Sequence, residues 1–581
     1  MANTEQTITD QIETDHPARA LLWISLFQGA CLYFLYGSME ALRWPATDPA
    51  WFFPLATLTV IAPLMLLLSL TRENWHAVAR DVAVLSTVLG FLAAYVGMQA
   101  KPFNGFPISR LTTVYMLTMG IASFKAVVHI QRRAERAGFS YPSLFTNSWR
   151  SFLLGALGAL FALIFYLTLV LWGTLFKVID IDFFQDLFSQ DWFVIPSISF
   201  AFGVGALLFR RHTQIIDSIT SILHSLFKLL LPLIVFLAVV FVSALPFTGL
   251  EPLWDTGNGT ALLLWLLAAL LFFVNAVYQD GRESDPYSPM LHRAIYLGIC
   301  TTPVIATLAF YGLFLRLQEY GWTVGRCWAF VTWLTLALLS LGYVVGVMRR
   351  RDAWTEDLAR TNTFMGLLLM VILLLANSPI LDFRKVSLAS QVDRVESGEI
   401  GLAEFDFYYA KHTLARPGYL YLEQLKVELG DSDPDLLAAV ENPVWSAANP
   451  VNSKLSWERV KRRPADLEVS SALRTVITES STFATGVEPL LLAEDLDSDG
   501  VDEYVLVLLW PANLGAVSAI LYYQDGDAWR PLNLSVQNPA TKATLLTLME
   551  GEITLIDQRF KDLDIGGVRL SVTIPRWVSV Q

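Results

Sequence analysis

The sequence is poor in charge and in cysteine, and it lacks the motifs of the common enzyme classes. Charged residues make up 16% of the 581 residues and hydrophobic residues 54%, a composition typical of multi-span membrane proteins. The three cysteines (Cys31, Cys300 and Cys327) are scattered along apolar runs, which argues against a disulfide framework or a cysteine metal cluster. The sequence contains no nucleophile elbow, P-loop, dinucleotide fingerprint or zinc-protease helix. The composition therefore indicates a membrane protein, and the missing motifs make a non-enzymatic protein the first hypothesis.

Long apolar runs fill the first two-thirds of the chain. A bilayer core of about 30 Å requires roughly 20 apolar residues in a helix, and about eleven runs fit that length. The first run follows an acidic start without a small-residue cleavage site, so we expect a retained span rather than a signal peptide. The expected spans are 21–40, 51–70, 82–100, 111–130, 151–176, 193–209, 229–247, 261–278, 294–314, 328–348 and 363–381.

Basic residues between the spans predict the orientation. With the N-terminus placed in the cytoplasm, about sixteen Lys and Arg residues fall in inner segments and about six in outer loops. An odd number of spans then places the C-terminal region in the periplasm of a bacterium. The expected organisation is a cytoplasmic tail (1–20), a multi-span domain (21–381), a periplasmic helical segment (382–445) and a periplasmic α+β domain (446–581).

Two connecting segments have helical amphipathic patterns, Thr213 to Lys228 on the expected inner side and Asp180 to Trp192 on the outer side. We expect them to be connectors on the membrane surface, and a role in gating a substrate is the alternative. Charged side chains within the spans are nearly absent, apart from Lys125, and paired carboxylates are missing. This weighs against a proton-driven transporter but leaves a neutral or lipid-like substrate open.

Three segments around the last spans carry a family resemblance. They are Leu-Arg-Leu-Gln-Glu-Tyr-Gly-Trp-Thr-Val-Gly-Arg at 315–326, Ser-Leu-Ala-Ser-Gln-Val-Asp-Arg at 387–394, and Phe-Asp-Phe-Tyr-Tyr at 405–409. Together they resemble an uncharacterised family of bacterial inner-membrane proteins, domain of unknown function four-one-five-three (DUF4153). The resemblance implies a location in the bacterial inner membrane and carries no known activity.

The Tyr-Gly-Trp at 320–322 has the pattern of an interfacial aromatic belt, with Gly321 permitting a turn between two spans. We interpret this segment as a structural elbow. The alternative is a contact with a ligand through polar residues on the outer side, namely Arg316, Glu319, Tyr320 and Arg326.

The C-terminal region changes in charge and periodicity. It holds 30 acidic and 18 basic residues after Leu381, which disfavours nucleic acid as a partner and is compatible with cations. Helical patterns cover 386–395, 402–414, 419–429 and 434–440, and a further helix is expected near 464–480. Strand-like runs follow at 488–493, 504–509, 517–523, 529–532 and 568–574, with a hairpin signal at Asp525-Gly526. A soluble α+β domain should therefore follow the polytopic helical membrane domain.

An Asp-rich segment between the first two of those strands carries the clearest chemical signal. Acidic residues stand at positions 1, 3, 5 and 9, and Gly500 at position 6 permits a sharp turn. Alternate carboxylates and one backbone carbonyl can then face a single centre, as a hard cation such as Ca²⁺ requires. The expected ligands are Asp495, Asp497, Asp499, Val501 through its carbonyl, and Glu503. Leu506 occupies the position where an EF-hand has Glu, so a hairpin calcium loop fits better, and an acidic hairpin without metal is the alternative.

Three functions are compatible with these observations. The first is an envelope scaffold or sensor in the bilayer, with a periplasmic Ca²⁺-binding module that can contact another envelope protein. The second is a transporter or channel for a neutral or lipid-linked solute. The third is an envelope enzyme acting on a lipid carrier. A polar cavity within the membrane would favour transport, a solid bundle the scaffold, and an outer groove lined by Glu319 and Arg326 the enzyme.

Overall fold

The structure is a computed structural model, and its contacts divide the chain into two units. The membrane unit comprises Met1–Ser397 with Tyr409–Val440, and the sheet unit comprises Gly398–Tyr408 with Glu441–Gln581. The structure describes residues 17–71, 73–101, 108–134, 141–278, 286–350, 354–430, 433–441, 443, 457, 460–464, 467, 469–480, 488–494, 496, 502–509, 517–525, 528–534, 563–565 and 568–570.

Eleven helices in the described ranges are long and apolar enough to cross a membrane, which confirms the expected number and makes this a multi-pass membrane protein. They are α2 (Ala18–Glu40), α3 (Pro49–Ser69), α4 (Trp75–Met98), α5 (Ile108–Ala134), α6 (Tyr141–Val178), α8 (Asp191–Arg211), α9 (Thr213–Thr248), α11 (Gly259–Tyr278), α12 (Pro289–Tyr320), α13 (Val324–Arg350) and α14 (Thr355–Ala376). The helices α7 (Phe183–Ser189) and α10 (Glu251–Asp255) are short connectors.

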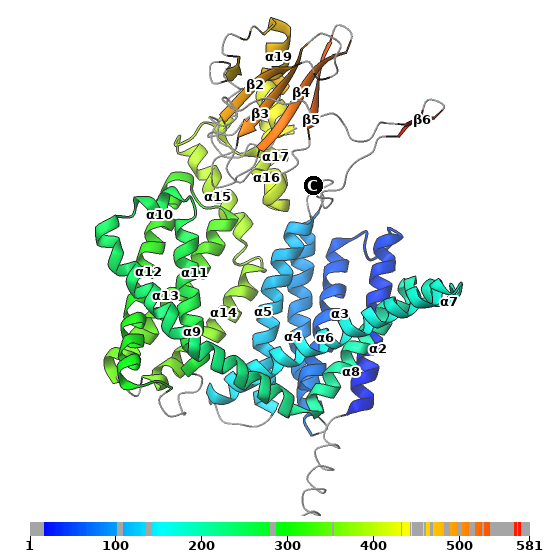
Figure 1. The fold of residues 1–581 in the computed structure, drawn as a ribbon, viewed down its shortest axis with the longest axis vertical. Helices are drawn as coiled ribbons and strands as arrows, with labels where there is room; N and C mark the ends of the chain where they lie inside the picture. Colours follow the sequence, from blue (N-terminus) through cyan, green and yellow to red (C-terminus); the bar gives the residue numbers. More distant parts are fainter. Residues whose placement is uncertain are drawn as a thin grey trace, which may run out of the picture. The chain divides into compact units, whose positions relative to one another are not determined.

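The long helices form two neighbouring bundles, seen in Figure 1 as a blue-to-cyan group and a green group. The N-terminal bundle contains α2 to α6 and α8, and the C-terminal bundle contains α9 and α11 to α14. Each bundle closes over its own apolar core. Helix α9 joins them, because Ile216 near its start belongs to the first core and Leu231 and Val235 belong to the second. The segment 213–228 is therefore the first part of one continuous helix rather than a separate surface connector, whereas the expected outer connector forms the separate helix α7.

Alternate helices run in opposite directions, so the basic residues gather at one end of the bundles. We call the end that carries Arg132, Arg133, Arg210, Arg349 and Arg350 the arginine-rich end.

Polar side chains stabilise both ends of helix α3. Asp48 caps its start and pairs with Lys101, the carboxylate oxygen lying 2.7 Å from Nζ. The guanidinium of Arg210 donates to the last backbone carbonyls of α3 and its C-cap, with two nitrogen-to-oxygen distances of 2.7 Å.

The last span differs from the sequence expectation of 363–381. Helix α14 begins at Thr355 and ends at Ala376. Pro379 explains the early end, because a proline disfavours helical geometry in the residue before it and has no N–H to donate. The amide of Asn377 donates to the carbonyl of Leu373 at 2.9 Å and so satisfies one of the last helical acceptors.

Shorter helices follow the last span: α15 (Phe383–Glu396), the 3₁₀ turn η2 (Leu402–Glu404), α16 (Phe407–Thr413), α17 (Ala415–Leu429) and α18 (Pro434–Glu441). Helix α17 includes Pro417 and Gly418, where the sequence suggested a break. Proline is tolerated there because N–H groups in the first turn have no partner within the helix. Gly418 is required, since a Cβ at this position would lie 2.0 Å from the backbone oxygen of Ala410 in α16.

The sheet unit contains a five-stranded sheet in the order β1 to β5, with α19 (Ser471–Ser480) against it. The strands are β1 (Lys461–Arg463), β2 (Glu488–Glu494), β3 (Glu503–Leu509), β4 (Val517–Asp525) and β5 (Ala528–Leu534); β6 (Leu563–Ile565) and β7 (Val568–Leu570) form a separate pair. All neighbours in the large sheet are antiparallel except β1 and β2. The β4–β5 hairpin closes with Asp525 opposite Ala528, as the turn signal predicts.

Candidate functional site

A cavity of about 530 Å³ lies between the two bundles, within the usual range for small-molecule sites. We call it the first cavity. Its walls come from α5 and α6 of the N-terminal bundle and from α11, α13 and α14 of the C-terminal bundle. The lining includes Thr335 and Leu369, which lie near the middle of α13 and α14, and Tyr141 at the start of α6. The cavity therefore extends from the arginine-rich end to about the middle of the spans.

A hydrogen-bonded cluster of four polar side chains forms part of its wall. The hydroxyl of Tyr343 donates to Oδ1 of Asn362 at 2.6 Å. Nδ2 of Asn362 lies 2.8 Å from the hydroxyl of Tyr141 and 2.7 Å from Oδ1 of Asn275. Tyr141 in turn donates to the same oxygen of Asn275 at 2.7 Å. Each residue comes from a different helix, so the cluster connects α6, α11, α13 and α14.

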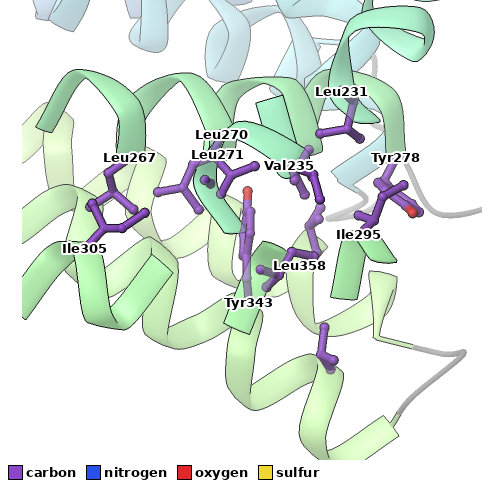
Figure 2. Close-up of a cluster of buried hydrophobic side chains, with 14 of the residues drawn as sticks. Leu231, Val235, Leu267, Leu270, Leu271, Tyr278, Ile295, Ile305, Tyr343 and Leu358 are labelled. Carbon is purple, nitrogen blue, oxygen red and sulfur yellow. The ribbon is translucent and has the colours of Figure 1, made fainter. Parts of the chain in front are cut away.

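The apolar core of the C-terminal bundle fixes the position of this cluster. Tyr343 is 1% exposed, and its ring lies beside Leu271 and Leu358 in Figure 2. Polar groups within a bilayer are costly unless they are paired, so the four side chains satisfy one another. One donor group is left over, because Nδ2 of Asn275 has no acceptor among the described residues. This amide therefore offers hydrogen bonds to the first cavity that it lines.

Two basic side chains one helical turn apart on α5, Lys125 and His129, line the same cavity. The ammonium of Lys125 reaches towards α14, where it lies 4.0 Å from the point that a Cβ would occupy at Gly366. The absence of a side chain on Gly366 thus leaves space for the lysine. None of the residues that line the cavity is acidic.

Aromatic rings form another wall of the cavity. Trp149 packs against Phe145 and Phe152 along α6, with ring centroids 6.3 and 6.4 Å apart. It also contacts Phe227 of α9, which packs on Phe272 of α11. Phe152 and Phe272 are 58% and 49% exposed, so this wall extends to the lipid-facing surface. The first cavity therefore combines a polar, basic part with an apolar part, as an amphiphilic ligand would require.

A second cavity of about 450 Å³ lies farther along α5 and α14, towards the opposite end of the bundles. Its lining includes Leu111, Tyr115, Asn377 and Asp382. Asp382 forms a buried ion pair with Arg384 at 2.8 Å and accepts a 2.7 Å hydrogen bond from Tyr95. This carboxylate is thus already satisfied by protein groups.

The contact between α5 and α14, which we call the seam, separates the two cavities. Along α5, Thr118, Met119 and Ala122 lie between the residues that line the two cavities, and all three are at most 4% exposed. Nδ2 of Asn377 donates to Oγ1 of Thr118 at 2.9 Å across the seam. Thr118 lies seven residues before Lys125, about 10 Å along the helix. A short buried stretch of α5 therefore lies between the two cavities.

The elbow is the turn at 320–323 between α12 and α13. The four residues considered for ligand contact lie in it or close to it in sequence, and they make contacts within the protein. Arg326 donates to the carbonyls of Tyr320 and Gly321 at 3.3 and 2.9 Å, and its guanidinium stacks on the Tyr320 ring at 5.2 Å. Arg316 donates to the backbone oxygen of Gly257. The backbone oxygen of Glu319 accepts from Arg394 at 2.9 Å. These contacts position the elbow, and ligand binding by the four residues stays a prediction.

Helix α15 holds the elbow from outside. Gln391 donates to the carbonyls of Tyr320 and Trp322 at 2.9 and 3.1 Å, and Ser390 accepts the N–H of Trp322 at 3.0 Å. Tyr409 accepts the N–H of Val324 at 2.8 Å. Burial raises the pKa of Tyr409, so its phenol remains protonated across the physiological pH range. The turn between these two spans thus depends on side chains from two later helices, α15 and α16.

Most of the expected calcium ligands, namely Asp495, Asp497, Asp499 and Val501, lie outside the described residues. Glu503 begins β3, is 8% exposed and accepts the N–H of Leu496 at 2.7 Å. Within the described ranges no group of three His, Cys, Asp or Glu side chains is placed to hold a metal ion. The Ca²⁺ site stays a prediction.

Sequence reasoning did not identify the first cavity. Lys125 and Asn275 were visible as polar residues within spans, but Asn362 and Tyr343 gave no separate signal. The informative pattern is that Lys125, Asn275, Tyr343 and Asn362 lie at a similar depth from the arginine-rich end. Recognising this pattern requires knowledge of which helices are neighbours.

Comparisons with known proteins give one match. Searches of curated proteins and of solved structures found none. The family model described as Domain of unknown function (DUF4153) matches residues 21–425, a range that includes both cavities, the seam and the elbow. The match confirms the resemblance noted in the sequence, and the chain belongs to the DUF4153 family.

Proposed function

We propose that the membrane unit transports an amphiphilic or lipid-linked solute along the seam between its two bundles. One observation carries this proposal: two cavities lie on the same pair of helices, and a short buried stretch of α5 lies between them. A solid bundle, as expected for a pure scaffold, would have no such pair. The buried side chains fall into two apolar cores, one in each bundle, so we expect one bundle to tilt against the other while α9 and Tyr141 keep them connected at the arginine-rich end.

We further propose that the protein lies in a bacterial inner membrane with its N-terminus in the cytoplasm and its sheet unit in the periplasm. The excess of basic residues at the arginine-rich end and the odd number of candidate spans support this orientation. Protease added to intact spheroplasts should then remove the C-terminal tail. Removal only in inverted vesicles would show the opposite orientation.

Accessibility of a single cysteine tests transport without knowledge of the solute. Gly366→Cys is suitable because a Cβ there meets only the end of Lys125 within 4 Å. The native Cys31, Cys300 and Cys327 are first replaced by Ala. In vesicles of known orientation, a membrane-impermeant thiosulfonate should modify this cysteine from both sides, and more slowly from the side opposite the arginine-rich end. Leu267→Cys, in the C-terminal core and 0% exposed, is the control that should react from neither side.

Modification from the arginine-rich side alone would contradict the proposal, because a static cavity opens to one side only. Equal and fast modification from both sides would indicate a channel rather than a carrier with alternating access.

The second candidate function is a scaffold or sensor role for the sheet unit, with Ca²⁺ bound in the loop between β2 and β3. The spacing of Asp495, Asp497, Asp499, Val501 and Glu503 supports it, as does the antiparallel pairing of Glu494 in β2 with Glu503 in β3. A partner protein would then bind the Ca²⁺-dependent conformation of the loop. Titration calorimetry of the full-length protein should give one weak site, with a Kd of about 10⁻⁴ to 10⁻³ M.

The double variant Asp497→Ala with Asp499→Ala should abolish this heat. Asp525→Ala, which changes an acid in another hairpin, should leave it unchanged. An unchanged heat in the double variant would rule out the loop as the Ca²⁺ site.

A further inference from the structure

Two side chains that line the first cavity offer hydrogen-bond donors that no described residue accepts. Lys125 has no ion pair or hydrogen bond with any residue that the structure describes, and the amide nitrogen of Asn275 has no acceptor there. His129 adds a ring nitrogen on the same wall. A ligand that satisfies these groups must supply acceptor oxygens.

The charge of the side chains that line the first cavity also points to a ligand with acceptor oxygens. Lys125 lies within a candidate span, where an unpaired ammonium is unfavourable, and no acidic side chain lines the cavity to neutralise it. The carboxylates nearest the same helix ends already have arginine partners. Asp81 pairs with Arg80 and Arg133, at 2.9 and 3.4 Å, and Asp357 pairs with Arg350 at 3.4 Å. The missing counter-ion must therefore come from outside the described chain.

We propose that the first cavity binds an anionic head group, a phosphate or carboxylate attached to an apolar chain. This inference rests on the proposed transport function and names the class of its solute. The ammonium of Lys125 is the counter-ion, and the amide of Asn275 supplies a second donor. The chain lies along the aromatic wall, where Phe152 and Phe272 reach the lipid-facing surface. That lateral opening favours a lipid as the source of the anion over a free anion from water.

Quenching of Trp149 by brominated lipids tests the proposal, because its ring lines the cavity. The full-length protein is placed in phosphatidylcholine nanodiscs that contain increasing fractions of brominated phosphatidate or brominated phosphatidylcholine. The protein has 18 tryptophans, so the signal of Trp149 is the difference between the wild type and Trp149→Phe. Brominated phosphatidate should quench Trp149 at a mole fraction about tenfold lower than brominated phosphatidylcholine, the preference expected from one charge-assisted hydrogen bond.

Lys125→Met should abolish this preference, and Lys125→Arg should keep most of it. Lys177→Met, in the last turn of α6 and exposed, removes a lysine far along the helix from the cavity and should change nothing. Lys125→Met removes an unpaired charge from a span, so we expect it to fold, and its thermal midpoint is measured in parallel.

An unchanged preference in Lys125→Met would overturn the proposal. Equal quenching by both brominated lipids, in the wild type and in this variant, would also overturn it, while two-sided labelling of Gly366→Cys would still support transport. Relief of quenching by millimolar inorganic phosphate would support an anion site but assign its ligand to the aqueous phase rather than to lipid. One-sided labelling together with retained lipid preference would refute transport and keep the anion site.

Discussion

Gly321→Ala should destabilise the membrane unit by about 2–5 kcal/mol. Gly321 has φ of 67° and ψ of −171°, a region that only glycine occupies readily. Holding another residue there costs about 1–3 kcal/mol. A Cβ would also lie 2.9 Å from Cδ of Arg394, 3.0 Å from Nε2 of Gln391 and 3.0 Å from Oγ of Ser390. These side chains hold the elbow, and displacing one or two of their hydrogen bonds costs about 1 kcal/mol each.

The measurement is unfolding in mixed micelles of dodecyl maltoside and SDS, followed by tryptophan fluorescence. Gly325→Ala is the matched control. It lies four residues farther on in α13, and a Cβ there meets no heavy atom within 4 Å. Alanine at 325 should therefore leave stability unchanged or raise it by up to about 1 kcal/mol. Gly321→Asn should be as unfavourable as Gly321→Ala, because ψ near 180° is not the left-handed helical geometry that Asn tolerates.

Equal unfolding midpoints for Gly321→Ala and Gly325→Ala would refute the reasoning. They would mean that the backbone relaxes to another conformation and that α15 does not depend on the elbow. Hydrogen exchange of the peptide covering 387–394 separates the two contributions. Faster exchange in Gly321→Ala indicates lost contacts with α15, and unchanged exchange with lower stability indicates backbone strain alone.

Three further predictions use the same unfolding assay. Lys101 holds the pKa of Asp48 below its ordinary value, so the stability that this ion pair adds is present above about pH 4 and is lost as the pH falls further. Asp48→Asn keeps the helix cap and should cost at most about 1 kcal/mol at pH 7. At acidic pH its stability should equal that of the wild type. Arg210→Ala should cost about 1–3 kcal/mol because two carbonyls at the end of α3 lose their donor, whereas Arg211→Ala, at an exposed position, should cost less than about 0.5 kcal/mol. Asn362→Leu should cost about 1–3 kcal/mol, since the hydroxyl of Tyr343 loses its acceptor and the oxygens of Tyr141 and Asn275 lose a donor, and an unchanged midpoint would contradict the role given to the cluster.

Features that depend on local pattern could be predicted from the sequence. Eleven spans follow from run length and hydropathy, because the bilayer sets both. The elbow follows from Gly321 between two apolar helices, and the β4–β5 hairpin follows from its turn residues. The limits of the spans could be predicted less exactly than their number. The polar first residues of α14, from Thr355, have the composition of a loop, and their helical structure depends on contacts with other helices.

Features that depend on the neighbours of each helix could not be predicted. Asn275 and Asn362 are 87 residues apart and lie in one cluster only because α11 and α14 pack in the same bundle. The short strand β1 is formed by Lys461–Arg463, a basic run with low strand propensity, and it exists because it pairs with β2. The continuity of α9 likewise depends on its contacts with both apolar cores.

The contacts at the seam and at the elbow differ in strength, and this difference indicates where movement should occur. Between α5 and α14, Asn377 donates one hydrogen bond to Thr118, and such bonds within membranes contribute about 0.6 kcal/mol on average. At the arginine-rich end, Tyr141 of α6 is bonded to both Asn275 and Asn362 of the C-terminal bundle. The elbow, in contrast, is held by several side chains from α15 and by a strained glycine. Opening at the seam therefore costs less than disruption of the elbow, so the C-terminal bundle should move as a body that keeps its α12–α13 turn. Asn377→Leu should then increase modification of Gly366→Cys from the side opposite the arginine-rich end, while Gln391→Ala at the elbow should lower stability without changing the side preference.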